Sequence, residues 1–286
     1  MKVKIFDTEI ELRNYYCSLN GLEPSEIEQP YINLYVQFKG CNANCKFCEY
    51  KNLGHNFNVK KFEKVLNKLS KQIEVRKISL TGGESTINKH FYEVVDIVSK
   101  YNAFLVVNTN GVDLKEIHKK GYTEKFDSIA LSRHHYQDEK NNEILQFNAV
   151  SIEELKKMKL NNLHLSCNLQ KDYINSNKEI YKYLDFAAEI GCDDVGFVSL
   201  MKINDYAKKQ HIDFDDLDLV FDRYYKIKEW KYEDSCKCNN YLYLTKDGTI
   251  VKVYNRSNLK QTSTISNNMI FDGENLKTGF NGKIII

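Results

Sequence analysis

The sequence predicts an α/β protein built on a parallel β-sheet, and three observations support this fold class. Between residues 31 and 200, apolar segments of strand length alternate six times with amphipathic segments of helix length. Such alternation is typical of parallel strands joined by right-handed helical crossovers. Polar and glycine residues follow the expected strands, at the edge where both open sheets and (β/α) barrels bind ligands. Residues 231–286 lack the helical pattern and carry strand signals instead.

The elements follow from hydrophobic periodicity. Two short alternating segments at the start predict a hairpin that turns at Asp7-Thr8. Parallel strands are expected at 31–38, 77–80, 103–107, 128–131, 163–169 and 194–200. Helices are expected at 58–73, 89–101, 114–120, 152–158, 177–190 and 214–230. Asn58 is the expected N-cap of the first helix.

The chain divides into three parts by composition. Residues 1–30 are expected to form an N-terminal extension, 31–230 the main α/β domain, and 231–286 a small β-rich C-terminal cap. Within the cap, two alternating segments around Asp247-Gly248 predict a second hairpin. The hairpin is preceded by Cys236 and Cys238, which could ligate a second cluster, donate a hydrogen atom, or have no function.

Composition narrows the function classes. The 286 residues include 41 basic and 39 acidic side chains, and the lysines are scattered, so no nucleic-acid or membrane surface is expected. No apolar run is long enough to span a membrane, and the first residues do not open a secretory signal peptide. Eight cysteines without an export signal indicate a reducing compartment and a metal role. We therefore expect a cytoplasmic protein.

Three of these cysteines, Cys41, Cys45 and Cys48, form the pattern C-x3-C-x2-C directly after the first parallel strand. Thiolates are the usual ligands of iron–sulfur clusters, which normally take four. Three local ligands therefore predict a cluster with one iron open to another molecule. Zinc, with His55 as fourth ligand, is an alternative, as is a redox pair of Cys45 and Cys48. The cluster interpretation is preferred because the spacing to His55 fits no known zinc pattern and the redox pair leaves Cys41 unexplained.

The cysteine spacing, with Phe47 before the last cysteine, resembles the signature of the radical SAM enzymes. The segment Thr81-Gly82-Gly83-Glu84 is similar to the Gly-Gly-Glu motif of that superfamily. The resemblance covers roughly residues 31–200. It implies a partial (β/α)6 TIM-like barrel, with a [4Fe-4S] cluster on Cys41, Cys45 and Cys48. S-adenosylmethionine would chelate the open iron.

The resemblance also implies roles for further residues. Gly82 and Gly83 would let the backbone approach the cofactor, and Glu84 would accept hydrogen bonds from its ammonium group; a simple β-to-α turn is the alternative. Phe47 would contact the adenine or only pack beside the loop. The remaining cofactor contacts would come from residues at strand ends, namely Asn108, Ser132, Arg133 and Asn168. Arg133 would pair with the carboxylate, unless it is a surface residue. His134 and His135 would bind substrate or lie in a solvated loop.

The activity implied by the resemblance is reductive cleavage of S-adenosylmethionine, followed by hydrogen abstraction from a substrate. An electron donor such as flavodoxin or ferredoxin would be a partner, and the cluster would be oxygen-sensitive. The C-terminal part resembles the twitch-type extension of peptide-modifying (RiPP maturase) members, which favours a ribosomally made peptide as substrate. It departs from that pattern because Val253-Tyr-Asn-Arg256 replaces a further cysteine. The alternative substrate is a small metabolite or nucleoside, and a non-catalytic iron–sulfur or zinc protein is a remote one.

Overall fold

The computed structural model describes residues 1–12, 29–49, 54, 56–214, 217, 224–230, 240–245, 248–254, 267–279 and 282–286. In this part of the chain, one eleven-stranded sheet has the order β13-β12-β3-β4-β5-β6-β7-β8-β11-β10-β9. Neighbours within β3–β8 are parallel, and β12 and β11 add parallel strands at the two sides. The outermost strands β13, β10 and β9 are antiparallel.

The strand bounds agree with the expected segments to within a few residues. The parallel strands are β3 (Tyr31–Phe38), β4 (Glu74–Gly82), β5 (Phe104–Thr109), β6 (Ser128–Ser132), β7 (Leu163–Leu169) and β8 (Asp194–Ser199). The other strands are β1 (Lys2–Ile5), β2 (Thr8–Glu11), β9 (Tyr224–Trp230), β10 (Asn240–Thr245), β11 (Ile250–Tyr254), β12 (Asn268–Phe271) and β13 (Leu276–Thr278).

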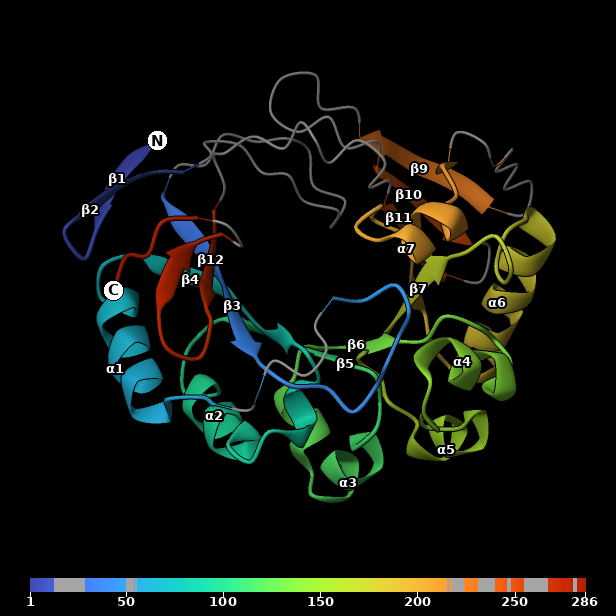
Figure 1. The fold of residues 1–286 in the computed structure, drawn as a ribbon, viewed down its shortest axis with the longest axis horizontal. Coiled ribbons are helices and arrows are strands. Elements are labelled where there is room, and N and C mark those ends of the chain that lie inside the picture. The colour runs from blue at the N-terminus through green and yellow to red at the C-terminus, as the bar shows by residue number, and fades with distance from the viewer. Residues whose placement is uncertain are drawn as a thin grey trace.

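The helices lie on the outer side of the curved sheet, as Figure 1 shows for α1, α2 and α3. They are α1 (Val59–Ser70), α2 (Phe91–Val98), α3 (Leu114–Lys119), α4 (Asp138–Leu145), α5 (Ile152–Met158), α6 (Asn177–Glu189) and α7 (Asp205–Gln210). The expected α/β class and partial barrel are confirmed. Among the described strands, the sheet ends in β13 and β9 and does not close on itself.

Alternating burial within β3 shows which face of the sheet is apolar and which is polar. Ile32, Leu34, Val36 and Phe38 are at most 1% exposed and face the helices. The intervening Asn33, Tyr35 and Gln37 are half-buried on the concave face. The first helix begins as expected, because the Asn58 side chain accepts the N–H of Lys61 at 3.0 Å. The helices therefore cover the apolar face, and a polar face lines the inside of the sheet.

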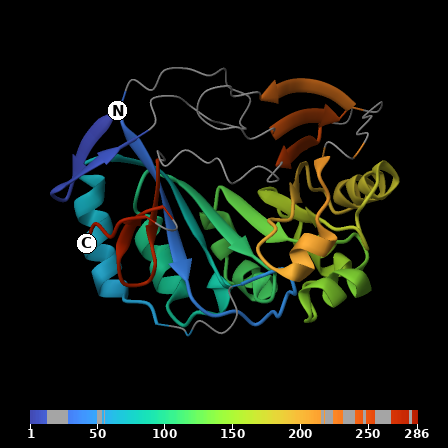
Figure 2. The ribbon, with the colours of Figure 1, turned by 45° about the horizontal axis from the view of Figure 1, so that its top comes forward.

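The C-terminal segment joins the main sheet on both sides. The expected hairpin is confirmed as the antiparallel pair β10 and β11, and β11 pairs with β8 in parallel. Figure 2 shows β9, β10 and β11 together at one side of the molecule. On the other side, β12 pairs with β3, with Asn268 opposite Asn33. The proposed boundary between residues 230 and 231 stays a prediction.

Three expectations need correction or addition. The helix over 214–230 is wrong, because Tyr224–Trp230 forms β9 and pairs with β10. Helices α4 and α7 were not expected. The first hairpin is confirmed, but it turns at Phe6 and Asp7, whose φ values are 51° and 81°. Residues Cys17, His55, Cys236 and Cys238 lie outside the described residues.

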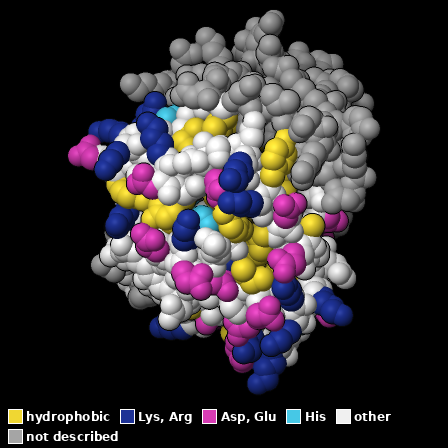
Figure 3. Space-filling view, turned by 90° about the vertical axis from the view of Figure 1, so that its right-hand side faces the viewer, with side chains coloured by type: hydrophobic (Ala, Val, Ile, Leu, Met, Phe, Trp, Pro, Cys, Tyr) yellow, Lys and Arg dark blue, Asp and Glu magenta, His cyan; other side chains and the backbone are white. Residues whose placement is uncertain are grey.

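The surface agrees with the mixed composition. On the face seen in Figure 3, Lys and Arg side chains are interspersed with Asp and Glu. None of the described helices is long and apolar enough to cross a membrane.

Candidate functional site

The cysteine loop follows β3 at the carboxyl edge of the parallel strands. Cys41, Cys45 and Cys48 are half-buried. Sγ of Cys41 accepts the N–H of Ala43 at 3.4 Å, and the N–H of Cys48 donates to the carbonyl of Cys45 at 3.1 Å. Burial raises the pKa of the Cys41 thiol, and the nearby Glu84 and Cys48 raise it further. A bound metal would have to offset this cost by stabilising the thiolate.

The donor set of the loop fits an iron–sulfur cluster, because three thiols lie on one segment that follows a strand. In the described part of the chain, no group of three His, Cys, Asp or Glu side chains is arranged to hold a single metal ion. In a [4Fe-4S] cluster each cysteine binds a different iron. Cys41, Cys45 and Cys48 would hold three irons and leave the fourth to S-adenosylmethionine. When bound, these groups supply one-electron reduction and radical chemistry.

The base of the loop is fastened to the end of β4. The N–H of Gly83 donates to the carbonyl of Phe38 at 2.9 Å, and that of Glu84 to the carbonyl of Gly40 at 2.8 Å. A Cβ on Gly82 would collide with the Phe38 carbonyl, and one on Gly83 with the Gly40 carbonyl. Gly82 also has a φ of 114°. Both glycines are therefore required for this close approach of the two strand ends.

The two unexpected helices hold the far side of the loop. Leu145, the last residue of α4, accepts the N–H of Asn44 at 3.2 Å, and its carbonyl lies 3.7 Å from Sγ of Cys45. At the start of α7, the side chain of Asn204 donates to the Lys46 carbonyl at 3.2 Å. Asn204 also caps α7 by accepting the N–H of Ala207. An Asn before a short polar helix is the signal that could have revealed α7.

Glu84 lies beneath the loop and is 1% exposed. Its carboxylate accepts the hydroxyls of Thr86 at 2.7 Å and Thr109 at 2.8 Å, and the N–H of Asn110 at 2.6 Å. Burial raises the pKa of this carboxyl, and the hydrogen bonds from these donors oppose the rise. The carboxylate is thus surrounded by donors of its own chain. A contact between Glu84 and S-adenosylmethionine stays a prediction.

Phe47 and the residues at the ends of β5, β6 and β7 border the same edge. The ring of Phe47 contacts His134 edge to face, with centroids 5.1 Å apart. Nδ1 of His134 accepts the N–H of Asn168 at 3.1 Å. The amide of Asn108 donates to Ser79 Oγ at 2.9 Å, and Ser132 is half-buried at the end of β6. The structure therefore gathers the expected residues at one edge, while their cofactor contacts stay predictions.

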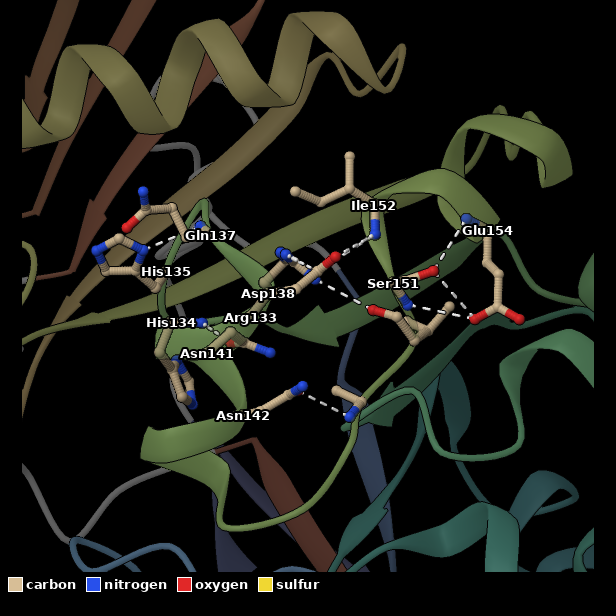
Figure 4. A network of polar contacts seen from close by, with 12 residues as sticks. Arg133, His134, His135, Gln137, Asp138, Asn141, Asn142, Ser151, Ile152 and Glu154 are labelled. Carbon is tan, nitrogen blue, oxygen red and sulfur yellow. Dashed lines mark hydrogen bonds and ion pairs between the residues drawn. The ribbon is translucent and has the colours of Figure 1, made fainter.

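Arg133 differs from these because its guanidinium lies beside Asp138, at the start of α4 (Figure 4). It is 1% exposed, pairs with Asp138 Oδ1 at 2.6 Å and donates to the Val150 carbonyl at 3.1 Å. The guanidinium also lies over the ring of Phe186, 4.9 Å from its centroid. These contacts indicate that Arg133 fastens α4 and α5 to the end of β6. Sequence reasoning did not anticipate this role.

The concave face below the loop carries charged side chains that sequence reasoning did not single out. Lys77 on β4 is half-buried, and its side chain makes no hydrogen bond or ion pair with any other described residue. Across the concave face, Lys252 on β11 pairs with Asp194 at 2.7 Å, and Asp194 contacts His164 at 2.9 Å. Burial and the charge of Lys252 lower the pKa of Lys77. The face thus holds an ammonium group with no counter-charge among the described residues.

Residues 35–164 match the family model of the radical SAM superfamily. A probable GTP 3',8-cyclase of Thermococcus kodakarensis is 28% identical over 175 residues, which cover 57% of this chain and 55% of the relative. The 7-carboxy-7-deazaguanine synthase of Clostridium acetobutylicum is 28% identical over 100 residues, covering 34% of this chain and 43% of the relative. Streptococcus suis SuiB bound to S-adenosylmethionine has a TM-score of 0.55 at 18% identity, covering 66% of this chain and 45% of SuiB.

The chain spans about half the length of the curated relatives it matches. The matched region begins within β3 and includes the cysteine loop, Gly82, Gly83 and Glu84. Members of this family are enzymes that use a [4Fe-4S] cluster and S-adenosylmethionine, and the three thiols of the cysteine loop are compatible with such a cluster. Residues 35–164 therefore form a radical SAM domain by their family model, and the fold of the chain is similar to that of SuiB.

Proposed function

We propose that this chain reductively cleaves S-adenosylmethionine and abstracts a hydrogen atom from a small purine nucleotide. Two observations of different kinds support this substrate class over a peptide. The names of the curated relatives specify GTP and a deazaguanine, and the alignments cover 57% and 34% of this chain. The second observation is structural: the Lys77 ammonium on the concave face has no counter-charge among the described residues, and this supports a phosphorylated ligand.

Lys77 is suited to bind an anion because its ammonium lacks a counter-charge. A half-buried ammonium loses hydration, and a phosphate would compensate with charge-assisted hydrogen bonds. Lys252 lies near enough to lower the pKa of Lys77, so an anion between them would be attracted by both. Asn33, opposite Lys77 on β3, adds an amide to the same face. A neutral peptide segment would leave the charge of Lys77 uncompensated.

The distance from Lys77 to the edge of the sheet suits a nucleotide. Thr81 lies four positions after Lys77 on the strand, which corresponds to about 13 Å. A nucleotide with its phosphates at Lys77 would therefore bring its sugar and base toward the cysteine loop. Hydrogen abstraction would occur at that end, close to Phe47 and His134.

A ribosomally made peptide is the rival substrate. SuiB has also been solved with its precursor peptide SuiA, but its 18% identity to this chain supports a shared fold only. The twitch-like character of residues 231–286 is the remaining argument for a peptide. We further propose a flavodoxin- or ferredoxin-type protein as electron donor and the cytoplasm as the location of the reaction.

The proposal is tested with anaerobically reconstituted protein, S-adenosylmethionine and dithionite. We expect GTP to increase the formation of 5′-deoxyadenosine and, when deuterated on the ribose, to transfer deuterium into that product. ATP and guanosine serve to separate the contributions of the base and the phosphates. If no purine nucleotide transfers deuterium while a peptide does, the substrate class is wrong.

A lysine variant tests the geometric part of the proposal. Lys77→Gln removes the charge and should weaken GTP binding by roughly ten- to a hundred-fold, while guanosine binding stays unchanged. The matched control is Lys115→Gln, because Lys115 is exposed and pairs with Glu154 on the outside. Equal GTP affinity in the wild type and Lys77→Gln would exclude Lys77 as the phosphate site.

A further inference from the structure

We infer that Asn110 is a positioning residue for the iron–sulfur cluster and that Glu84 holds it in place. In this arrangement the Asn110 amide donates an N–H to the Cys41 sulfur and makes the bound cluster easier to reduce. The inference rests on the cluster being bound by the three cysteines. It does not depend on the substrate, so it can fail or succeed separately from the proposed function.

The Asn110 side chain is fixed at both of its polar atoms. Its Nδ2 donates to Asn42 Oδ1 at 2.8 Å and lies 3.9 Å from Cys41 Sγ. Its Oδ1 accepts the N–H of Val112 at 3.1 Å. Asn110 is 8% exposed. With the carbonyl oxygen used by Val112, the amide can present only its N–H groups to the cysteine loop.

Glu84 determines where the Asn110 backbone lies. Its Oε2 accepts the N–H of Asn110 at 2.6 Å, and its Oε1 accepts the Thr109 hydroxyl at 2.8 Å. The same hydroxyl accepts the N–H of Gly111 at 2.9 Å, which closes the turn after β5. The backbone of Glu84 meanwhile donates to Gly40, next to Cys41. Glu84 thus connects the base of the cysteine loop to the turn that carries the Asn110 side chain.

The hydrogen bond to sulfur has an electrostatic consequence. Reduction adds negative charge to a cluster, and an N–H donor at a ligand sulfur stabilises that extra charge. Hydrogen bonds to the ligands of a metal site can change its reduction potential without any contact with the metal itself. Loss of the amide should therefore make the cluster harder to reduce. A carboxylate in the same place should have a larger effect, because it adds repulsion.

The test uses reconstituted full-length protein and three variants. Asn110→Asp keeps the size of the side chain and the acceptor for Val112, and Asn110→Ala removes the amide. We expect the iron content of Asn110→Asp to match that of the wild type. The reduction potential, measured by a spectroscopic redox titration, should shift to more negative values in Asn110→Ala and further in Asn110→Asp.

Asn162→Ala is the matched control. The Asn162 amide also makes two hydrogen bonds, to the Thr123 carbonyl at 3.0 Å and the Phe126 carbonyl at 2.6 Å, but it precedes β7 at the other edge of the sheet. Its loss should leave the potential unchanged. A wild-type potential in iron-replete Asn110→Asp overturns the inference. Loss of iron from both Asn110 variants, with the control intact, also overturns it, because Asn110 would then only anchor the loop.

Discussion

The ring of Phe47 meets the ring of His134 edge to face, with the two centroids 5.1 Å apart. This contact joins the cysteine loop to the end of β6. His134 is 4% exposed, and its Nδ1 accepts the N–H of Asn168, so the neutral ring carries its proton on Nε2. Burial lowers the pKa of His134 to about 4. The loop therefore packs against a neutral imidazole at physiological pH.

This burial predicts a pH dependence of stability. The pKa values of His134 and of the adjacent His135 are lowered to about 4, mainly by burial. Between pH 6.5 and 4 the unfolded chain binds more protons at these rings, so acid favours unfolding. The free energy of unfolding should fall across this window, by up to about 3 kcal/mol for each ring. Urea titrations at several pH values measure this loss.

Histidine variants isolate this contribution. His134→Asn and His135→Asn keep an acceptor near the position of Nδ1 but cannot be protonated, so each should show a flatter pH profile than the wild type. Glu84 acts in the opposite direction, because a carboxyl with a raised pKa stabilises the folded state as the pH falls. Its contribution is common to all the variants and cancels in the comparison. Identical slopes in all three proteins would contradict the prediction.

The second prediction concerns the buried ion pair of Arg133 and Asp138. Asp138→Ala leaves the guanidinium, which is 1% exposed, without its anion. Removal of one partner from a fully buried pair typically costs 3–5 kcal/mol, and because the Asp138 side chain is 32% exposed we expect the unfolding free energy to fall by about 3 kcal/mol or less. Thermal and urea unfolding measure the change. At temperatures where the variant is folded, the affinity for S-adenosylmethionine should stay within a factor of about three of the wild type.

The control is the exposed pair of Lys208 and Asp205, which has a similar contact distance of 3.0 Å. Asp205→Ala should change the unfolding free energy by less than about 1 kcal/mol, because exposed pairs contribute little. A large loss of cofactor affinity in folded Asp138→Ala would instead support the contact between Arg133 and the cofactor carboxylate expected from the sequence.

The third prediction concerns the cysteine loop. Replacing Cys41, Cys45 or Cys48 by Ala should abolish the visible absorbance of the cluster and the formation of 5′-deoxyadenosine, because each thiolate holds a separate iron. Far-ultraviolet circular dichroism should show that the variants are folded. Cys192→Ala is the control, since burial raises the pKa of Cys192 to about 12 and it lies at the amino end of β8. A full cluster in the triple variant would show that the ligands lie elsewhere.

The sequence was most informative where periodicity and spacing act over short distances. The parallel strands and α1 were predicted because apolar side chains alternate or recur along them, as in Ile32 to Phe38. The cysteine loop was predicted from spacing alone. Helix α4 was missed because Asp138–Leu145 is mostly polar, and its contact with Arg133 is not visible in a local pattern. Tyr224–Trp230 was assigned to a helix because its pairing with β10 is not visible in a local pattern.

The roles of site residues were harder to predict because they depend on three-dimensional partners. Arg133 and Glu84 were both expected to contact the cofactor. The structure surrounds Glu84 with donors from the turn after β5 and places Asp138 at the Arg133 guanidinium. The sequence pattern did not identify Lys77 as a candidate site residue, because only its position on the concave face distinguishes it from the many surface lysines.

The last prediction is that the chain binds a single cluster. A second [4Fe-4S] cluster would need at least three further thiolates, and residues 231–286 contain only Cys236 and Cys238. Cys167 and Cys192 are 0% and 2% exposed, and burial raises the pKa of both, so neither can serve as a surface ligand. After reconstitution we expect about four irons per chain. Iron analysis with Mössbauer and EPR spectra tests this number.

Variants of the C-terminal cysteines complete the test. Cys236→Ala and Cys238→Ala should leave the iron content and the rate of S-adenosylmethionine cleavage close to the wild type. Product formation would fall in these variants only if one of the two thiols reacts with the substrate radical. About eight irons per chain and two distinct reduced EPR signals would show a second cluster. Cys17 would then be the first residue to test as its additional ligand, because it is the remaining cysteine outside the cysteine loop and the buried strands.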